Sequence, residues 1–307
     1  MCWAAAKETP ESEPPSVLVQ SRPTLTAMRC MWMSEIRHRK KLSFHTAYAK
    51  RISLESINYD PIQLHPDSSK LYPMFDPQAI LYEDNHLLIV NKQAGELVQP
   101  DPSGDTALEE EIKAYLKVRD QKPGNVFLGV VHRIDRPVSG VVLFAKTGKA
   151  LVRMNEEVKN REIKKIYWAL TENRPLQDEG KLIHFLVRDG KTNRSRVYDR
   201  PTEMSKEARL RYRVLTQSTH YYLLEVDLET GRHHQIRAQL SKIGCPIRGD
   251  LKYGARRSNR DGSISLHARS IEFIHPVRKE RICITAPVPA NDSLWQFAEQ
   301  AVSQSCQ

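Results

Sequence analysis

The chain has 307 residues, 40% of them hydrophobic, which is enough for one large domain or two modest ones with a sizeable core. Its formal net charge of +10 favours a polyanionic partner, either nucleic acid or, less favoured, an anionic membrane surface. No apolar run of about 18 uncharged residues occurs, so no membrane-spanning helix is predicted. The first residues do not form a signal sequence, and we expect a cytoplasmic protein.

The cysteines are five in number, an odd set scattered along the chain. None stands at metal-ligand or redox spacing, so free thiols in a reducing cytosol are predicted. A lone cysteine of this kind is more often part of the core than a catalyst. The five are Cys2, Cys30, Cys245, Cys283 and Cys306.

Residues 1–76 lack clear periodicity and contain several prolines. We expect this region to be partly disordered, with an ordered segment allowed before Pro73. The basic cluster RHRKK at 37–41 is interpreted first as a solvated face, with RNA contact as the alternative. Several methionines offer alternative starts: Met28, Met31 and Met33.

A folded domain is predicted over residues 77–303. Residues 80–92 have the pattern of two short strands around an Asp-Asn turn. Residues 106–119 are predicted to form a helix capped by Thr106. The apolar stripe of this helix consists of Leu108, Ile112 and Leu116.

Strands dominate the rest of the chain. The apolar run 141–145 predicts a strand buried on both faces, and 149–161 an amphipathic helix. Strands with occasional helices predict an α+β domain on a largely antiparallel mixed sheet flanked by helices. The expected strands are 164–172, 181–188, 206–216, 221–229, 264–274 and 281–287, with helices at 231–243 and 291–302.

Asp135 lies in the stretch HRIDRPVSG, between Arg133 and Arg136 and just before the apolar strand. One interpretation is a structural salt bridge or a turn-forming aspartate. The other is a nucleophile or base that nearby arginines keep ionised. Gly140 would allow a tight backbone where the strand begins.

In the stretch TGRHHQIRAQL, residues 230–240, Thr230 and Gly231 precede a predicted helical pattern. On a helix His233 and Arg237 share a face, so Arg237 would project from a rigid element toward a carboxylate. The neighbouring His233 and His234 would diverge, and no third ligand stands at useful spacing. We therefore predict no metal site.

The stretch KKIYWAL, residues 164–170, places Tyr167 and Trp168 on opposite faces of a strand. Either both rings pack in the core, or one faces a pocket and stacks on a base. Two basic, loop-like stretches, 188–200 and 248–260, suit a phosphate backbone, although a solvated hairpin tip is the simpler interpretation. Together they favour RNA contact.

HRIDRPVSGVVLFAK, residues 132–146, resembles the catalytic motif HRLDRxTSGLLLFAK of the RluA-type family of RNA pseudouridine synthases. KKIYWAL resembles the family's tyrosine motif, and TGRHHQIRAQL resembles TGRxHQIRxHL. ILYEDNHLLIVNKQAG resembles the opening of the domain, and RGDLKYG and LHARSIEFIHP its closing segments. The resemblance covers about residues 80–287. It implies the pseudouridine synthase fold with an RNA-binding cleft, and isomerisation of uridine in rRNA or tRNA without a cofactor.

The resemblance also implies roles. Asp135 matches the catalytic aspartate, Tyr167 the tyrosine that stacks on the target uracil and helps to move the proton, and Arg237 the arginine that orients the aspartate. Arg133 matches an arginine that contacts RNA near the flipped nucleotide, and Leu266 an apolar pocket wall. Further substrate-binding residues are expected within the same motifs: His132, Arg136, Arg232 and Ile236.

Departures from the motifs leave these catalytic positions unchanged, so they bear on substrate preference. Val138 replaces a threonine, and the remaining departures are Ile134, Gln93, Gln99 and Gln239. The small N-terminal RNA-binding module of larger members has no clear copy here. The expected partner is an RNA stem-loop bound by a monomer, without DNA, membrane or metal. The alternative is a non-catalytic RNA-binding or ribosome-assembly protein on the same fold.

Overall fold

The computed structural model describes residues 75–304, which belong to one unit of the chain. Its helices are α2 (Leu108–Arg119), α3 (Gly148–Asn160), α4 (Gln235–Lys242) and α5 (Ser293–Gln304), with 3₁₀ turns η1 (Pro77–Ala79) and η2 (Leu251–Tyr253). Its strands are β1 (Ile80–Glu83), β2 (Leu87–Lys92), β3 (Gly129–Val130), β4 (Ser139–Ala145), β5 (Lys164–Thr171), β6 (Glu179–Asp189), β7 (Arg194–Tyr198), β8 (Lys206–Gln217), β9 (Tyr222–Leu228), β10 (Leu266–Ile274) and β11 (Arg281–Thr285).

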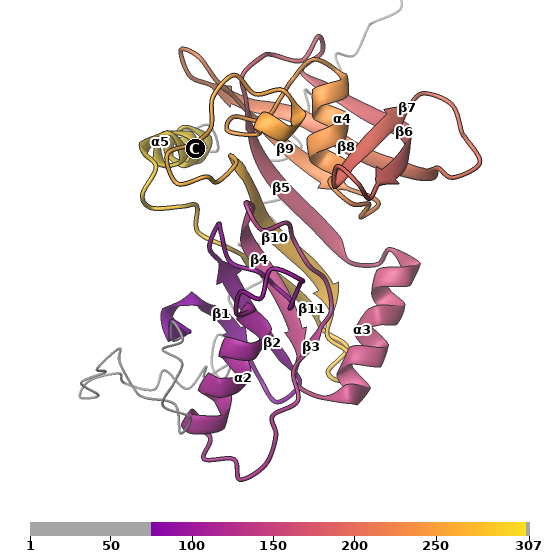
Figure 1. Ribbon diagram of the computed structural model, residues 1–307. Coiled ribbons are helices and arrows are strands. Elements are labelled where there is room, and N and C mark those ends of the chain that lie inside the picture. Colours follow the sequence, from indigo (N-terminus) through magenta and orange to yellow (C-terminus); the bar gives the residue numbers. More distant parts are fainter. Residues whose placement is uncertain (1–74, 305–307) are drawn as a thin grey trace, which may run out of the picture. The chain divides into compact units, whose positions relative to one another are not determined.

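These strands form one mixed sheet in the order β1-β2-β4-β10-β5-β9-β8-β6-β7, with β3 paired to β4 and β11 to β10 (Figure 1). Within the described residues β4 and β10 run parallel, and the other strand pairs are antiparallel. The predicted α+β fold with a largely antiparallel mixed sheet is therefore confirmed.

Strand β4 lies between β2 and β10, and its residues are buried, as the apolar run predicted. Gly140 has a φ of +114°, and a Cβ atom there would stand 2.3 Å from the carbonyl oxygen of Ala268 on β10. Glycine is thus the residue that permits the parallel pairing of the two strands. This pairing places the loop before β4 next to Leu266, where β10 begins.

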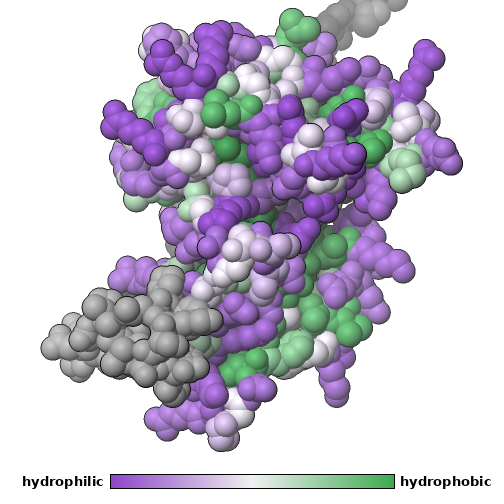
Figure 2. Space-filling view, viewed as in Figure 1, coloured by the Kyte–Doolittle hydropathy of each residue, from purple (hydrophilic) through white to green (hydrophobic). Residues whose placement is uncertain are grey.

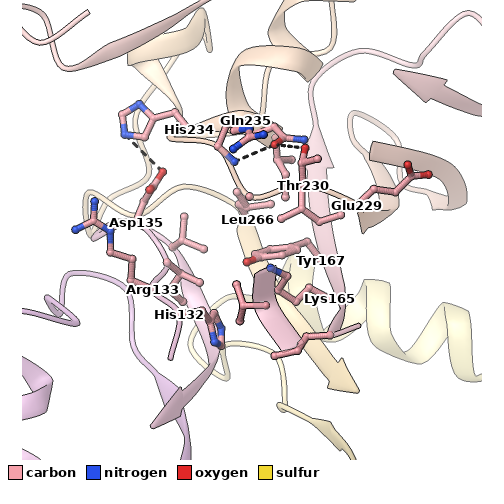
Figure 3. A pocket seen from close by; sticks show the side chains of 18 of the residues that line it. His132, Arg133, Asp135, Lys165, Tyr167, Glu229, Thr230, His234, Gln235 and Leu266 are labelled. Carbon is pink, nitrogen blue, oxygen red and sulfur yellow. Dashed lines mark hydrogen bonds and ion pairs between the residues drawn. The ribbon is translucent and has the colours of Figure 1, made fainter. Parts of the chain in front are cut away.

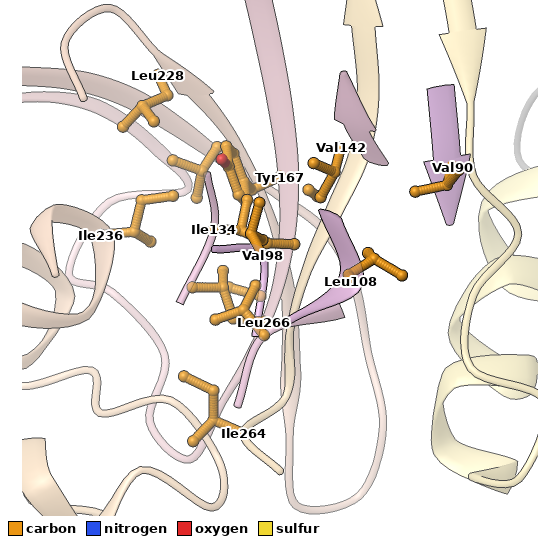
Figure 4. Close-up of a cluster of buried hydrophobic side chains, with 14 of the residues drawn as sticks. Val90, Val98, Leu108, Ile134, Val142, Tyr167, Leu228, Ile236, Ile264 and Leu266 are labelled. Carbon is orange, nitrogen blue, oxygen red and sulfur yellow. The ribbon is translucent and has the colours of Figure 1, made fainter. Parts of the chain in front are cut away.

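The main buried cluster joins the predicted stripe of α2 to the loop that carries Asp135 (Figure 4). Ile134 and Val138 are buried in this cluster, whereas the Asp135 side chain between them keeps 29% of its surface exposed. Apolar burial on both sides therefore anchors a carboxylate at the edge of the core. Tyr167 and Leu266 belong to the same cluster.

Some predicted boundaries were wrong. Thr106 does not cap α2: the N–H of Leu108 donates to the carbonyl of Leu97 at 2.7 Å, so main chain serves in place of a side-chain cap. Helix α4 begins at Gln235 rather than 231, because His234 has a left-handed φ of 51°. The stretch 188–200 is mostly the β6–β7 hairpin rather than a loop.

The expectations for residues 1–76, including the 37–41 cluster and the alternative starts, lie outside the described residues except at Phe75 and Asp76. Phe75 is buried, and its ring centroid is 5.4 Å from that of Tyr115. None of the helices between residues 75 and 304 is long and apolar enough to cross a membrane. In the same range, no cluster of three or more His, Cys, Asp and Glu suited to a metal occurs.

Candidate active site

A pocket of about 540 Å³ opens beside Asp135. Its walls come from the loop before β4, the end of α3, the start of β5 and the turn that leads into α4. Figure 2 shows a largely hydrophilic face that is hollowed between the segments bearing α4 and α3. In Figure 3, Asp135 and Arg133 lie on one side of the pocket, and Tyr167 and Lys165 on the strand that faces them.

Asp135 is held by Arg237, as the resemblance implied. The Nη1 atom of Arg237 donates to Oδ2 of Asp135 at 3.0 Å, across a sequence separation of 102 residues. Burial alone would lower the pKa of Arg237, but hydrogen bonds and charge from Asp250 and Asp135 raise it. The guanidinium therefore stays charged and orients the carboxylate.

Asp250 holds the other side of the Arg237 guanidinium. Its carboxylate accepts from Nε at 2.7 Å and from Nη2 at 2.9 Å, and its side chain is 1% exposed. Such a two-bond contact leaves the arginine little freedom to turn. Asp250 belongs to the RGDLKYG motif, and no role was predicted for it from the motif.

His234 also approaches Asp135, with Nε2 3.5 Å from the same Oδ2 atom (Figure 3). Burial, followed by the charge of Arg237, lowers the pKa of His234 to about 2, so the imidazole is neutral at physiological pH and the contact is polar rather than ionic. The hydroxyl of Tyr253 accepts from the Ser195 N–H at 2.7 Å and lies 3.0 Å from Nδ1 of His234. If that hydroxyl donates to Nδ1, Nε2–H points toward Asp135.

Tyr167 faces the pocket, and Trp168 lies on the opposite face of β5, as predicted. Tyr167 is 7% exposed, and burial followed by the charge of Asp135 raises the pKa of its phenol, which is therefore neutral. Trp168 packs in a separate cluster, with the guanidinium carbon of Arg269 4.3 Å from its ring centroid. Of the two rings, Tyr167 is the one available to a ligand in the pocket.

The arginines that flank Asp135 in sequence are not its partners. Arg136 points away, donates from Nε to the Gly95 carbonyl at 2.9 Å and pairs with Asp105 at 2.7 Å. It does not line this pocket, contrary to its predicted place among the substrate-binding residues. Arg133 is exposed at the pocket wall, without a hydrogen bond or ion pair among residues 75–304.

The fully buried Lys92 supports the backbone that follows Asp135. Its ammonium donates to the carbonyl oxygens of Gln93, Glu96 and Arg136 at 2.7, 2.9 and 3.1 Å. All three of its N–H donors are thereby used, one of them on the residue directly after Asp135. The motif NKQAG contains this lysine, but its role depends on a contact 44 residues away.

The other predicted substrate-binding residues line the pocket: His132, Arg133, Arg232, Ile236 and Leu266. Burial, followed by the charge of Lys165, lowers the pKa of His132 to about 3, and its Nδ1 atom is buried with no hydrogen-bond partner in the part of the chain described. The His132 imidazole is therefore neutral at the pocket wall.

The turn before α4 is built by Gln235, whose role the sequence analysis missed. Its Oε1 atom accepts from the Arg232 N–H at 3.0 Å and from the Thr230 hydroxyl at 2.8 Å. These two hydrogen bonds close the turn directly before α4, the helix that carries Arg237. The rings of His233 and His234 stack with centroids 3.7 Å apart, instead of diverging as expected for helical neighbours, because both precede the helix.

A family model described as RNA pseudouridylate synthase matches residues 86–242 of the chain. The chain belongs to this family. The RNA pseudouridine synthase YhcT of Bacillus subtilis is 31% identical over 235 residues, covering 73% of each chain. Ribosomal large subunit pseudouridine synthase C of Vibrio cholerae is 33% identical over 233 residues, covering 74% of this chain and 71% of its own.

Two solved human structures share the fold of this synthase. RNA Pseudouridylate Synthase Domain Containing 4 has a TM-score of 0.60 at 23% identity and covers 74% of this chain and 93% of its own. Domain Containing 1 has a TM-score of 0.54 at 22% identity, covering 72% and 94%. The predicted RluA-type resemblance is confirmed, and the protein is an RNA pseudouridine synthase, an isomerase that acts on RNA.

Proposed function

We propose that this synthase isomerises uridine in a structured RNA by extruding the target nucleotide into the pocket, where Asp135 acts on its ribose. The contact between Asp135 and Arg237 beside the pocket-facing Tyr167 carries the proposal. A carboxylate, its orienting cation and a stacking ring stand on three separate elements around one opening. This is the set of groups that the isomerisation needs.

The number of free carboxylates favours isomerisation over hydrolysis. A hydrolytic glycosidase generally uses two, one of which activates water. The second carboxylate of the pocket, Glu229, accepts from Arg211 at 2.9 Å and pairs with Lys181 at 3.1 Å. The other oxygen of Glu229, Oε2, lies 3.6 Å from Nε of Arg209, so both of its oxygens face cations. Arg237 and His234 both approach Oδ2 of Asp135, and its Oδ1 has no partner among residues 75–304. Asp135 is thus the carboxylate with an oxygen left for the ribose, and exclusion of water would keep the detached uracil from being lost.

In the proposed reaction the N1–C1′ bond breaks and its electron pair goes to the uracil. Asp135 either bonds to C1′ or takes the 2′ proton, and both routes free the base within the pocket. The uracil then turns and C5 bonds to C1′. In the first route the bond between Asp135 and C1′ breaks at this point, and in the second the proton returns to C2′. The C5 proton then leaves and N1 gains a proton. The product is an isomer of the substrate, so no atom is added from outside.

Extrusion of the base costs a few kcal/mol. Stacking on the Tyr167 ring would return about 1–3 kcal/mol. Ile236 and Leu266 form apolar walls for the base, and the exposed Arg133 stands where it could fill the space that the nucleotide leaves.

The charges around the pocket support an RNA backbone as ligand. Several of its basic side chains form no ion pair with a carboxylate among the described residues, so they are available to phosphates. They are Arg133, Lys159, Arg161, Lys165 and Arg232. The β6–β7 hairpin adds exposed basic residues at Arg188, Lys191 and Arg194.

We further propose ribosomal RNA as the substrate class, with a transfer RNA stem-loop as the alternative. Relatives from Vibrio cholerae and Xylella fastidiosa carry names of ribosomal large subunit pseudouridine synthases, C and D. A monomer that binds RNA rather than DNA, in the cytoplasm, remains the expectation.

The test is Asp135→Asn, which keeps the side-chain shape and removes the charge. Pseudouridine is mapped in RNA from cells lacking the protein, and in the same RNA after incubation with the purified variant or wild type. Wild type should restore a pseudouridine that Asp135→Asn does not, while both bind the RNA. Asp199→Asn, at an exposed residue that does not line the pocket, is the matched control and should behave as wild type. If wild type modifies no RNA, the non-catalytic binding protein becomes the better description.

A further inference from the structure

Lys165 is a pocket residue to which neither the motifs nor the steps above assign a chemical role. It precedes Tyr167 by two positions on β5, so both side chains project from the same face of the strand and line the same pocket (Figure 3). A Cβ atom on Gly231 would lie 3.8 Å from Nζ of Lys165. The ammonium therefore reaches the turn that leads into α4, on the side of the pocket that faces Asp135.

The surroundings of Lys165 among the described residues do not neutralise its positive charge. The side chain is half-buried, and no carboxylate among residues 75–304 is within ion-pair distance of its ammonium. Burial lowers the pKa of Lys165, and no neighbouring acid offsets this effect. A cation held in such a place costs stability unless a ligand brings the opposite charge.

The proposed reaction produces a negative charge inside the pocket, opposite to the charge of the Lys165 ammonium. When N1–C1′ breaks, the electron pair leaves with the base, and the uracil carries a negative charge shared by N1 and its carbonyl oxygens until C5 attacks C1′. This holds whether Asp135 bonds to C1′ or takes the 2′ proton. A preorganised cation beside the leaving base stabilises such a charge.

Other groups of the pocket are poorly suited to this task. Arg237 is bound to two carboxylates, Tyr167 is a neutral phenol, and His132 and His234 are neutral imidazoles. The remaining cations of the pocket differ from the half-buried Lys165: Arg133, Lys159 and Arg161 are exposed to solvent, and Arg232 donates from Nε to the Glu207 carbonyl at 2.9 Å. We propose that Lys165 is a catalytic residue that stabilises the uracil anion after the glycosidic bond breaks. The inference rests on the proposed function and adds to it the group that receives the leaving base.

The experiment compares Lys165→Met with Lys164→Met. Lys164 is the exposed neighbour in sequence on the other face of β5, so both variants remove one positive charge from the same strand. Single-turnover rates are measured with saturating enzyme on an RNA containing the target uridine, and Kd is measured by filter binding. Lys165→Met should lose about 10²–10³-fold in rate with Kd within about threefold of wild type. Lys164→Met should keep its rate.

The alternative is that Lys165 contacts a phosphate. In that case Lys165→Met would bind more weakly with a salt slope shallower by about 0.7–0.9, and its rate at saturation would match wild type. That result overturns the inference, as does equal behaviour of the two variants. Lys165→Arg, which keeps a cation, should recover most of the rate, and the neutral Lys165→Gln replaces the Met variant if that protein does not fold. Activity of wild type with loss in Asp135→Asn shows separately that the proposed function stands.

Discussion

Asp250 accepts two hydrogen bonds from the Arg237 guanidinium, at 2.7 and 2.9 Å, and so leaves the Nη1 atom to face Asp135. The arginine thus joins a buried carboxylate to a pocket carboxylate. The planar fork of the guanidinium allows this, because its donors point in fixed directions toward two acceptors at once. The orientation of Asp135 therefore depends on a residue that does not touch it.

Arg237→Lys should abolish most activity while RNA affinity is retained. A lysine ammonium cannot reproduce the two-bond contact with Asp250 and also reach Asp135, so the pocket carboxylate loses its orientation. We expect a rate loss of about 10²-fold or more at saturating enzyme, and little change in Kd. Arg232→Lys, on the turn before the helix, is the control and should lose far less rate. Near-normal turnover of Arg237→Lys would contradict this role.

Charge reversal on the β6–β7 hairpin should weaken RNA binding without slowing the bound complex. Arg188→Glu combined with Lys191→Glu removes exposed cations and adds repulsion toward phosphates. We expect a higher Kd and a shallower dependence of log Kd on log salt. Lys149→Glu, on exposed surface of α3 that does not line the pocket, should change both less. An unchanged salt slope would remove the hairpin from the RNA-binding surface.

Lys92 should make stability depend on pH in the alkaline range. Burial lowers its pKa from an ordinary 10.5 to about 8, so between these values the unfolded chain binds more protons than the folded one. The free energy of unfolding of wild type, relative to Lys92→Met, should therefore rise from pH 8 to pH 10.5. Urea denaturation at several pH values measures this difference. A flat difference would mean that the hydrogen bonds to the three carbonyls offset the effect of burial, so that the pKa of Lys92 is the same in the folded and unfolded chains.

Gly140→Ala should destabilise the fold by at least about 2 kcal/mol, because the new Cβ would stand 2.3 Å from the Ala268 carbonyl oxygen and the φ of +114° is strained for alanine. Gly190→Ala is the control, since a Cβ there meets no atom within 4 Å. Thermal unfolding of both variants gives the comparison. Equal melting temperatures would show that the close approach of β4 and β10 at Gly140 does not contribute to the stability of the fold.

Most of the elements, and the segments that carry the chemistry, could be predicted from the local pattern of residues. The apolar run at 141–145 became a buried strand, and the alternation at Tyr167 and Trp168 put the two rings on opposite faces. Both features are local: side chains alternate between the two faces of a strand, and an apolar run indicates burial. The family motifs also placed Asp135 and Arg237 at one site before any contact was known.

Which charges meet depends on how distant segments pack together. Arg136 is adjacent to Asp135 in sequence yet pairs with Asp105, whereas Arg237, 102 residues away, holds the carboxylate. Sequence proximity says little here, because the direction of each side chain follows from the order of strands in the sheet and from the turn before α4. Lys165, which has no ion-pair partner in the part of the chain that the structure describes, likewise emerged only when the walls of the pocket were assembled from distant segments. Charge and burial at a site are properties of all its neighbours together.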